Sequence, residues 1–145
     1  MAQEDKDLLL RDLCARLPYG IVINIGDKDL KLDKKHQCIG ILYPEDCSDE
    51  FNERNNNASF YITISGCYYG EEIKPYLRPM SSMTEGEEEE YWLIRCPQYD
   101  ENDNIINTDS ELFDWLNKKM FDYRGLIPMG LALEAPKGMY NVKEK

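Results

Sequence analysis

Apolar residues in the N-terminal segment recur with the period of an α-helix. Over residues 4–17 leucines alternate with charged side chains, and Pro18 follows directly. A proline cannot continue the backbone hydrogen bonding of a helix, so the helix is predicted to end there. Spacings of three and four residues place these side chains on one face: Leu10, Leu13, Cys14 and Leu17.

The pattern then changes to that of extended chain. Segment 20–26 is rich in β-branched residues and has a glycine at each end, which predicts a strand. Leu30 and Leu32 alternate with polar residues after a turn signal, which predicts the second strand of a hairpin. Further strands are predicted at residues 37–43, 59–65 and 68–69.

A polar stretch and two prolines interrupt these strands. Residues 44–57 include three consecutive asparagines and predict a long surface loop. Pro75 and Pro79 predict an extended or turn conformation where the sheet ends. We therefore expect a sheet region over residues 20–72, antiparallel and curled, with an SH3-like barrel as an alternative form.

The chain is predicted to become helical from residue 84. Overlapping capping boxes, Ser82-x-x-Glu85 and Thr84-x-x-Glu87, precede a helix at residues 85–95. We assign its buried side to residues 91–94. A second helix is predicted at 109–123, with Gly125 just beyond its end. Its apolar face would consist of Leu112, Phe113, Leu116, Met120 and Tyr123.

A run of strands followed by a run of helices is typical of α+β proteins. We expect one domain over residues 1–145, with a helical region at 84–125 packed on the sheet. The tail, residues 126–145, has an apolar stretch at 131–133 and is expected to pack back onto the domain.

Charge narrows the function classes. The formal net charge is −11, which repels nucleic-acid phosphates and anionic membranes and favours a protein partner. No apolar run approaches the roughly 20 residues that cross a bilayer. The N-terminus has acids where a signal peptide has basic residues, so we expect a cytoplasmic protein without direct nucleic-acid or membrane binding.

The residues that usually carry catalysis or bind cofactors form no recognised motif. His36 is the single histidine, and no zinc spacing exists among the 5 cysteines, which we interpret as free, mostly buried thiols. Glycine-rich phosphate loops and nucleophile elbows are absent from the sequence. We therefore predict no cofactor and no catalytic residues, and favour a protein that is not an enzyme.

One stretch matches part of a calcium-binding loop. EF-hand loops place oxygen ligands at fixed positions and need a glycine at position 6, where this chain has Ile105. Thr108-x-x-Glu111 is better explained as a capping box for the next helix. The alternative calcium ligands would be Asp100, Asn102, Asn104, Thr108 and Glu111.

The acids suggest one further alternative. A row of carboxylates can imitate the phosphates of DNA, and the rows available are Glu87–Glu90 and the Glu45–Glu53 segment. Glu88, Glu89 and Glu90 exceed what a helix cap requires. We predict these three residues as a contact surface.

Three blocks resemble a known group of sequences: KDLLLRDLCARLPYG, EEIKPYLRPMSSMT and DWLNKKMFDYRGLIPMGLALEAP. The group consists of uncharacterised small proteins of gut bacteria and their phages or mobile elements. The resemblance implies a mobile-element context and carries no activity or functional residue.

These observations favour a non-enzymatic protein-interaction module of a phage or mobile element, acting on an unknown protein partner. One alternative is an acidic nucleic-acid mimic that inhibits a host DNA- or RNA-binding enzyme. The other is an enzyme of unrecognised type, which requires a pocket with convergent polar groups.

Overall fold

A computed structural model describes residues 3–26, 28–32, 39–55, 57–58, 60–64, 67–69, 73–106 and 109–140. The helices are α1 (Gln3–Arg16), α2 (Asp49–Arg54), α3 (Glu85–Arg95) and α4 (Asp109–Lys118), with short 3-10 turns η1 (Leu17–Tyr19), η2 (Pro44–Asp46) and η3 (Met80–Ser82). The strands are β1 (Val22–Ile25), β2 (Lys28–Lys31), β3 (Ile39–Leu42), β4 (Tyr61–Ile64), β5 (Cys67–Tyr69), β6 (Ile73–Leu77) and β7 (Leu133–Glu134). The predicted α+β class is confirmed.

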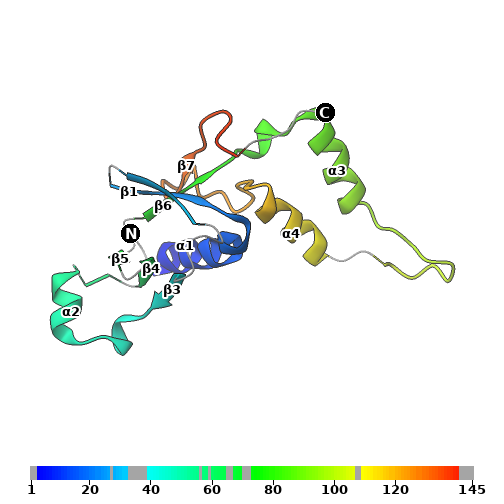
Figure 1. The fold of residues 1–145 in the computed structure, drawn as a ribbon. Helices are drawn as coiled ribbons and strands as arrows, with labels where there is room; N and C mark the ends of the chain where they lie inside the picture. The colour runs from blue at the N-terminus through cyan, green and yellow to red at the C-terminus, as the bar shows by residue number, and fades with distance from the viewer. Residues whose placement is uncertain are drawn as a thin grey trace.

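Two open sheets form the strand portion of the molecule (Figure 1). The first has the order β2-β1-β6-β7 and is mixed, because β6 and β7 run parallel. The second has the order β3-β4-β5 and is antiparallel. The barrel alternative is wrong for the described residues, since the outer strands β2 and β7 do not pair to close the sheet.

Strand β6 lies in the middle of the first sheet, so the sheet extends beyond residue 72, contrary to our prediction. It contains Pro75, paired in register with Ile23 of β1. The carbonyl of Leu77 accepts from Ala135 on the β7 side, and alternate residues of a strand face the same edge. The ring nitrogen of Pro75 therefore faces the β7 side of the strand. Strand β7 pairs only with Tyr76 and Leu77, so it does not extend far enough to pair with Pro75.

The predicted loop at residues 44–57 is partly helical. The Ser48 hydroxyl accepts a hydrogen bond from the backbone N–H of Phe51 and caps α2. The ring of Phe51 packs edge-on against Tyr61 of β4 at 5.1 Å between centroids. Residues 49–54 were predicted as loop rather than helix because five of the six are polar or charged.

Helix α4 ends earlier than predicted. Phe121 N–H donates to Leu116 O and Met120 N–H donates to Asn117 O, which is the hydrogen-bond pattern of a Schellman motif. Met120 occupies the left-handed position at φ 62°, where glycine is usual. Burial of its side chain, 1% exposed, offsets the backbone cost, so Gly125 is not the end of the helix.

The core lies between α1, the first sheet, β4 of the second sheet and the chain after α4. Helix α1 turns Leu9, Asp12, Leu13 and Arg16 inward, so the predicted face is right for Leu13, half-buried at Leu10 and Leu17, and wrong for Cys14. Arg16 donates to the Asp12 carboxylate at 2.9 Å and 3.1 Å, and Arg124 donates to the same carboxylate at 2.8 Å. This ion pair rotates the helix, and Cys14 is consequently exposed.

The tail packs back onto the sheet, as predicted. The Tyr140 hydroxyl accepts from the backbone N–H of Val22 at 3.1 Å and donates to the carbonyl of Tyr76 at 2.6 Å. It thus bridges β1 and β6 where their pairing ends. Burial raises the pKa of Tyr140 to about 12, so this hydroxyl stays protonated at neutral pH.

Candidate interaction surface

Helix α3 begins at the predicted capping box. Thr84 Oγ1 accepts from the backbone N–H of Glu87, and Glu87 Oε1 accepts from the backbone N–H of Thr84. This reciprocal pair selects Thr84, rather than Ser82, as the residue that starts the helix.

Glu87 also anchors the helix to the sheet. Arg78, which follows β6, donates to both Glu87 oxygens at 2.7 Å and 2.8 Å. The Arg78 guanidinium lies 4.2 Å from the centroid of the Phe121 ring. Burial by itself would raise the pKa of Glu87, but the hydrogen bonds from Arg78 and Thr84 and the Arg78 charge hold it below the ordinary value.

A second contact ties α3 to α4. Trp115 Nε1 donates to Glu90 at 2.9 Å, and the Trp115 ring lies 6.2 Å from that of Tyr91. Glu87, Glu90, Tyr91 and Ile94 are spaced as one helical face, and each is buried or half-buried. These contacts fix the rotation of α3 about its axis.

The opposite face of α3 is consequently exposed. Trp92 is 56% exposed and Leu93 is 66% exposed, so our assignment of residues 91–94 to the buried side is wrong for these two. The inward positions are filled instead by Glu87 and Glu90, which the sheet and α4 hold. A shallow depression on this face, hereafter the α3 surface, is lined by Glu85, Glu88, Glu89, Trp92, Leu93 and Cys96.

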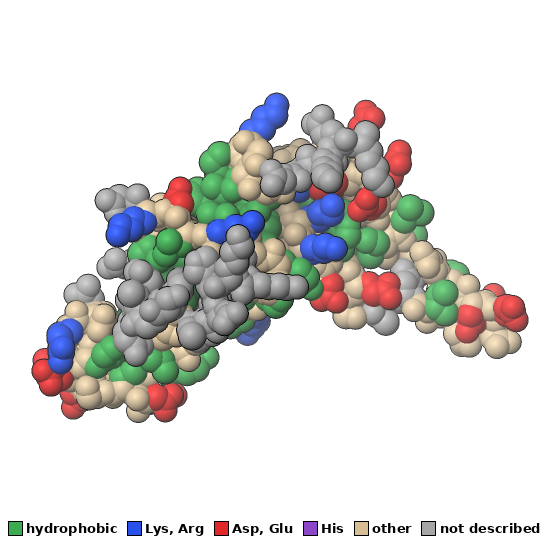
Figure 2. Space-filling view, viewed as in Figure 1, with side chains coloured by type: hydrophobic (Ala, Val, Ile, Leu, Met, Phe, Trp, Pro, Cys, Tyr) green, Lys and Arg blue, Asp and Glu red, His purple; other side chains and the backbone are tan. Residues whose placement is uncertain are grey.

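The predicted contact residues divide between the two faces. Glu88 and Glu89 lie on the α3 surface, whereas Glu90 faces inward and bonds to Trp115. Glu87, 4% exposed, is withdrawn from the acidic row proposed for nucleic-acid mimicry. The other row, Glu45–Glu53, is broken into η2 and α2. Figure 2 shows acids over α2 and over the α3–α4 side, with lysines and arginines mainly between them.

The residues of the alternative calcium loop form a turn. Asp100 Oδ1 accepts from the backbone N–H groups of Asn102 and Asn104 at 2.8 Å and 3.0 Å. The hydrogen bonds from Asn104 and Asn102 hold the pKa of Asp100 below its ordinary value. Glu111 is exposed on α4, while Thr108, with its capping box, lies outside the described residues. Within the described ranges, no group of three or more acidic, histidine or cysteine side chains could hold a metal ion.

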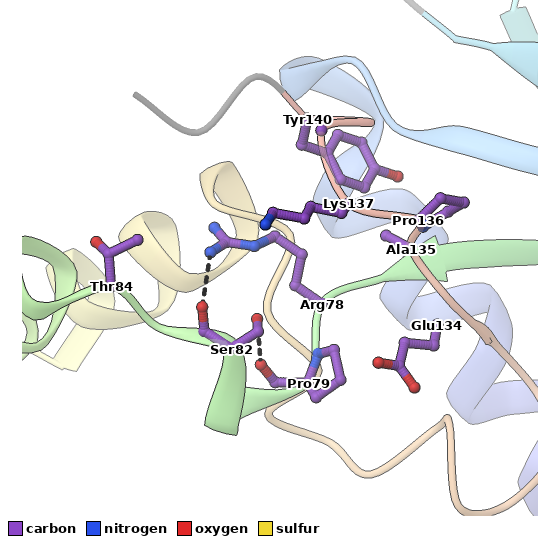
Figure 3. Close-up of a pocket in the computed structure, with 10 residues that line it drawn as sticks. Arg78, Pro79, Ser82, Thr84, Glu134, Ala135, Pro136, Lys137 and Tyr140 are labelled. Carbon is purple, nitrogen blue, oxygen red and sulfur yellow. Dashed lines mark hydrogen bonds between the residues drawn. The ribbon is translucent and has the colours of Figure 1, made fainter. Parts of the chain in front are cut away.

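A cavity of about 420 Å³ lies between the end of β6, η3 and the chain after β7 (Figure 3). Its polar lining includes Arg78, Ser82, Thr84, Glu134, Lys137 and Tyr140. Arg78 is already paired with Glu87, and the Tyr140 hydroxyl is held protonated by burial. Of its hydroxyl residues, Ser82 donates to the Pro79 carbonyl at 2.7 Å and Thr84 Oγ1 caps α3, so neither is held against a base and we assign no nucleophile–base pair to the cavity.

The cysteine prediction is wrong in part. Cys14 and Cys47 carry free thiols, but Cys14 and Cys96 are exposed rather than buried. His36 and Cys38 lie outside the described residues, and so does the side chain of Cys67. No helix among the described residues is both long and apolar enough to cross a membrane.

Comparisons of the chain with protein-family models, with curated proteins and with solved structures found no match. The resemblance to small proteins of gut bacteria and mobile elements therefore stays a prediction.

Proposed function

We propose that this protein is a cytoplasmic, non-enzymatic interaction module that binds a protein partner through the α3 surface. The observation that supports the proposal is the exposure of Trp92 and Leu93 side by side on a helix whose rotation is fixed. Covering a leucine-sized side chain contributes about 1.5–3 kcal/mol, and large aromatics are enriched where proteins bind one another.

The size of the surface indicates a modest contact. One face of the three-turn helix α3 presents less than the roughly 800 Å² per partner that a standard stable interface buries. A peptide-sized element of the partner, such as one helix, matches this area better than a second globular face.

The test immobilises three forms of the chain and compares the proteins that each form captures. The three forms are the wild type, Trp92→Ala/Leu93→Ala, and Tyr43→Ala/Met129→Ala. Tyr43 and Met129 are similarly exposed but lie outside the α3 surface. We expect quantitative mass spectrometry to find a protein that the first and third chains retain and the second loses. Hydrogen exchange should then show that the purified partner protects residues 85–96. Equal capture by all three chains would contradict the proposal.

A further inference from the structure

The charges of the α3 surface identify the class of its occupant, an inference that rests on the proposed function. Glu85, Glu88 and Glu89 are exposed and rim the apolar pair Trp92 and Leu93. In the described part of the chain none of these three carboxylates forms an ion pair, whereas neighbouring Glu87 is neutralised by Arg78. The surface thus combines an apolar contact with three carboxylates that outnumber the nearby cation Arg95, whose guanidinium lies 5.4 Å from the centroid of the Trp92 ring.

A second copy of the chain is a poor occupant. Two α3 surfaces in a symmetric contact would bring six carboxylates together, and each copy carries a net charge of −11. Two unit charges 4 Å apart interact by about 1 kcal/mol in water and about 4 kcal/mol near a protein surface. The free energy gained by burying Trp92 and Leu93 of one copy against those of the other would have to exceed this repulsion.

The order of acidic and apolar residues along α3 indicates which residues a complementary partner helix would need, and where. Glu85, Glu88 and Glu89 occupy the N-terminal half, and Trp92 and Leu93 occupy the C-terminal half, with Cys96 directly after the helix. At 1.5 Å per residue, each half is about 6 Å long, close to one helical turn. A partner helix would therefore match with basic residues on one turn and an aliphatic or aromatic anchor on the next.

We propose that the α3 surface binds a basic amphipathic helix of another protein, with its lysines or arginines at Glu85, Glu88 and Glu89 and its apolar anchor at Trp92 and Leu93. The opposite charges also accelerate encounter, so association should slow as salt is added.

The test uses three synthetic peptides of equal length and the full chain. One is an amphipathic Leu/Lys helix, the second has the same composition scrambled so that no apolar face forms, and the third is an amphipathic Leu/Glu helix. We expect fluorescence anisotropy to show binding of the first peptide about tenfold tighter than of the second, and no binding of the third.

Two variants that each lose three carboxylates test whether the peptide binds at the α3 surface. At a concentration where light scattering shows it to be monomeric, Glu85→Gln/Glu88→Gln/Glu89→Gln should bind the Leu/Lys helix about tenfold more weakly. Glu45→Gln/Glu50→Gln/Glu53→Gln removes the same charge near and within α2, away from the α3 surface, and should leave the affinity within about twofold. Bound peptide should also slow maleimide labelling of Cys96 while exposed Cys14 on α1 reacts unchanged.

Three results would overturn the partner class: equal affinity for the Leu/Lys helix and its scrambled isomer, equal losses in the two glutamine variants, or comparable binding of the Leu/Glu helix. Failure of the proposed function gives a different result, since Trp92→Ala/Leu93→Ala would then leave partner capture unchanged. Loss of capture in that variant together with a failed peptide test would retain the surface and reject only a basic partner.

Discussion

Two arginine–carboxylate pairs in this chain share the same i,i+4 spacing and differ in their surroundings. The Asp12 and Arg16 side chains are 0% exposed, whereas Glu50 and Arg54 on α2 are 79% and 72% exposed. A buried arginine that loses its carboxylate cannot be rehydrated, while an exposed one returns to water. The two pairs should therefore respond very differently to the same change.

We predict that Asp12→Asn lowers the free energy of unfolding by about 3–5 kcal/mol, because Arg16 is left charged and buried. Glu50→Gln should lower it by less than about 1 kcal/mol. Urea denaturation at neutral pH measures both. Similar losses in the two variants would show that burial does not govern the Asp12–Arg16 pair.

At the scale of single residues, the sequence shows how apolar side chains are spaced but does not show which charged side chains are buried. Because the prediction for α1 considered only the leucines and Cys14, it placed the inward face one residue away from the face that carries Asp12 and Arg16. The same rule sent Trp92 and Leu93 inward on α3. The spacing of Glu87, Glu90, Tyr91 and Ile94 was visible in the sequence, but partners for the two glutamates became apparent only when β6 and α4 were placed.

Helix α3 is held to the sheet by one ion pair that protonation can break. The folded-state pKa of Glu87 is below the 4.5 of an ordinary glutamate. The unfolded chain therefore binds this proton more readily, and the stabilisation by Glu87 is complete above pH 4.5 and lost as pH falls through the lower folded-state value.

We predict that Glu87→Gln costs about 3 kcal/mol of stability at pH 7 and that the difference from wild type shrinks steadily below pH 4. Glu88→Gln, on the exposed face, serves as the control and should change stability by less than about 0.5 kcal/mol at either pH. Denaturation curves at several pH values measure this. A pH-independent cost for Glu87→Gln would mean that shape, not charge, holds α3.

Elements with a local signal were predictable and those defined by distant contacts were not. The capping box placed α3, and β-branched runs placed β1 and β4, because these signals act over a few residues. Strand β6 was missed because Pro75 argues against a central strand unless the reach of β7 is known. The end of α4 was missed because burial of Met120 overrides the preference for glycine.

The acids of the α3 surface have a consequence for the whole molecule, because they oppose self-association of an exposed apolar face. We predict that the wild-type chain is monomeric by light scattering and that Glu85→Gln/Glu88→Gln/Glu89→Gln self-associates at the same concentration. Adding Trp92→Ala/Leu93→Ala to that variant should restore the monomer. A monomeric triple variant would show that the apolar pair is too small to drive association.

The Tyr140 bridge also bears on the order in which the chain is made. Val22 and Tyr140 are 118 residues apart, and synthesis at about 5–20 residues per second separates their appearance by roughly 6–24 s. During that interval β1 can pair with β2, but its backbone at Val22 has no Tyr140 hydroxyl to bond. Completion of the first sheet thus waits for Tyr140, which emerges well after the strands β1 and β6 that its hydroxyl joins.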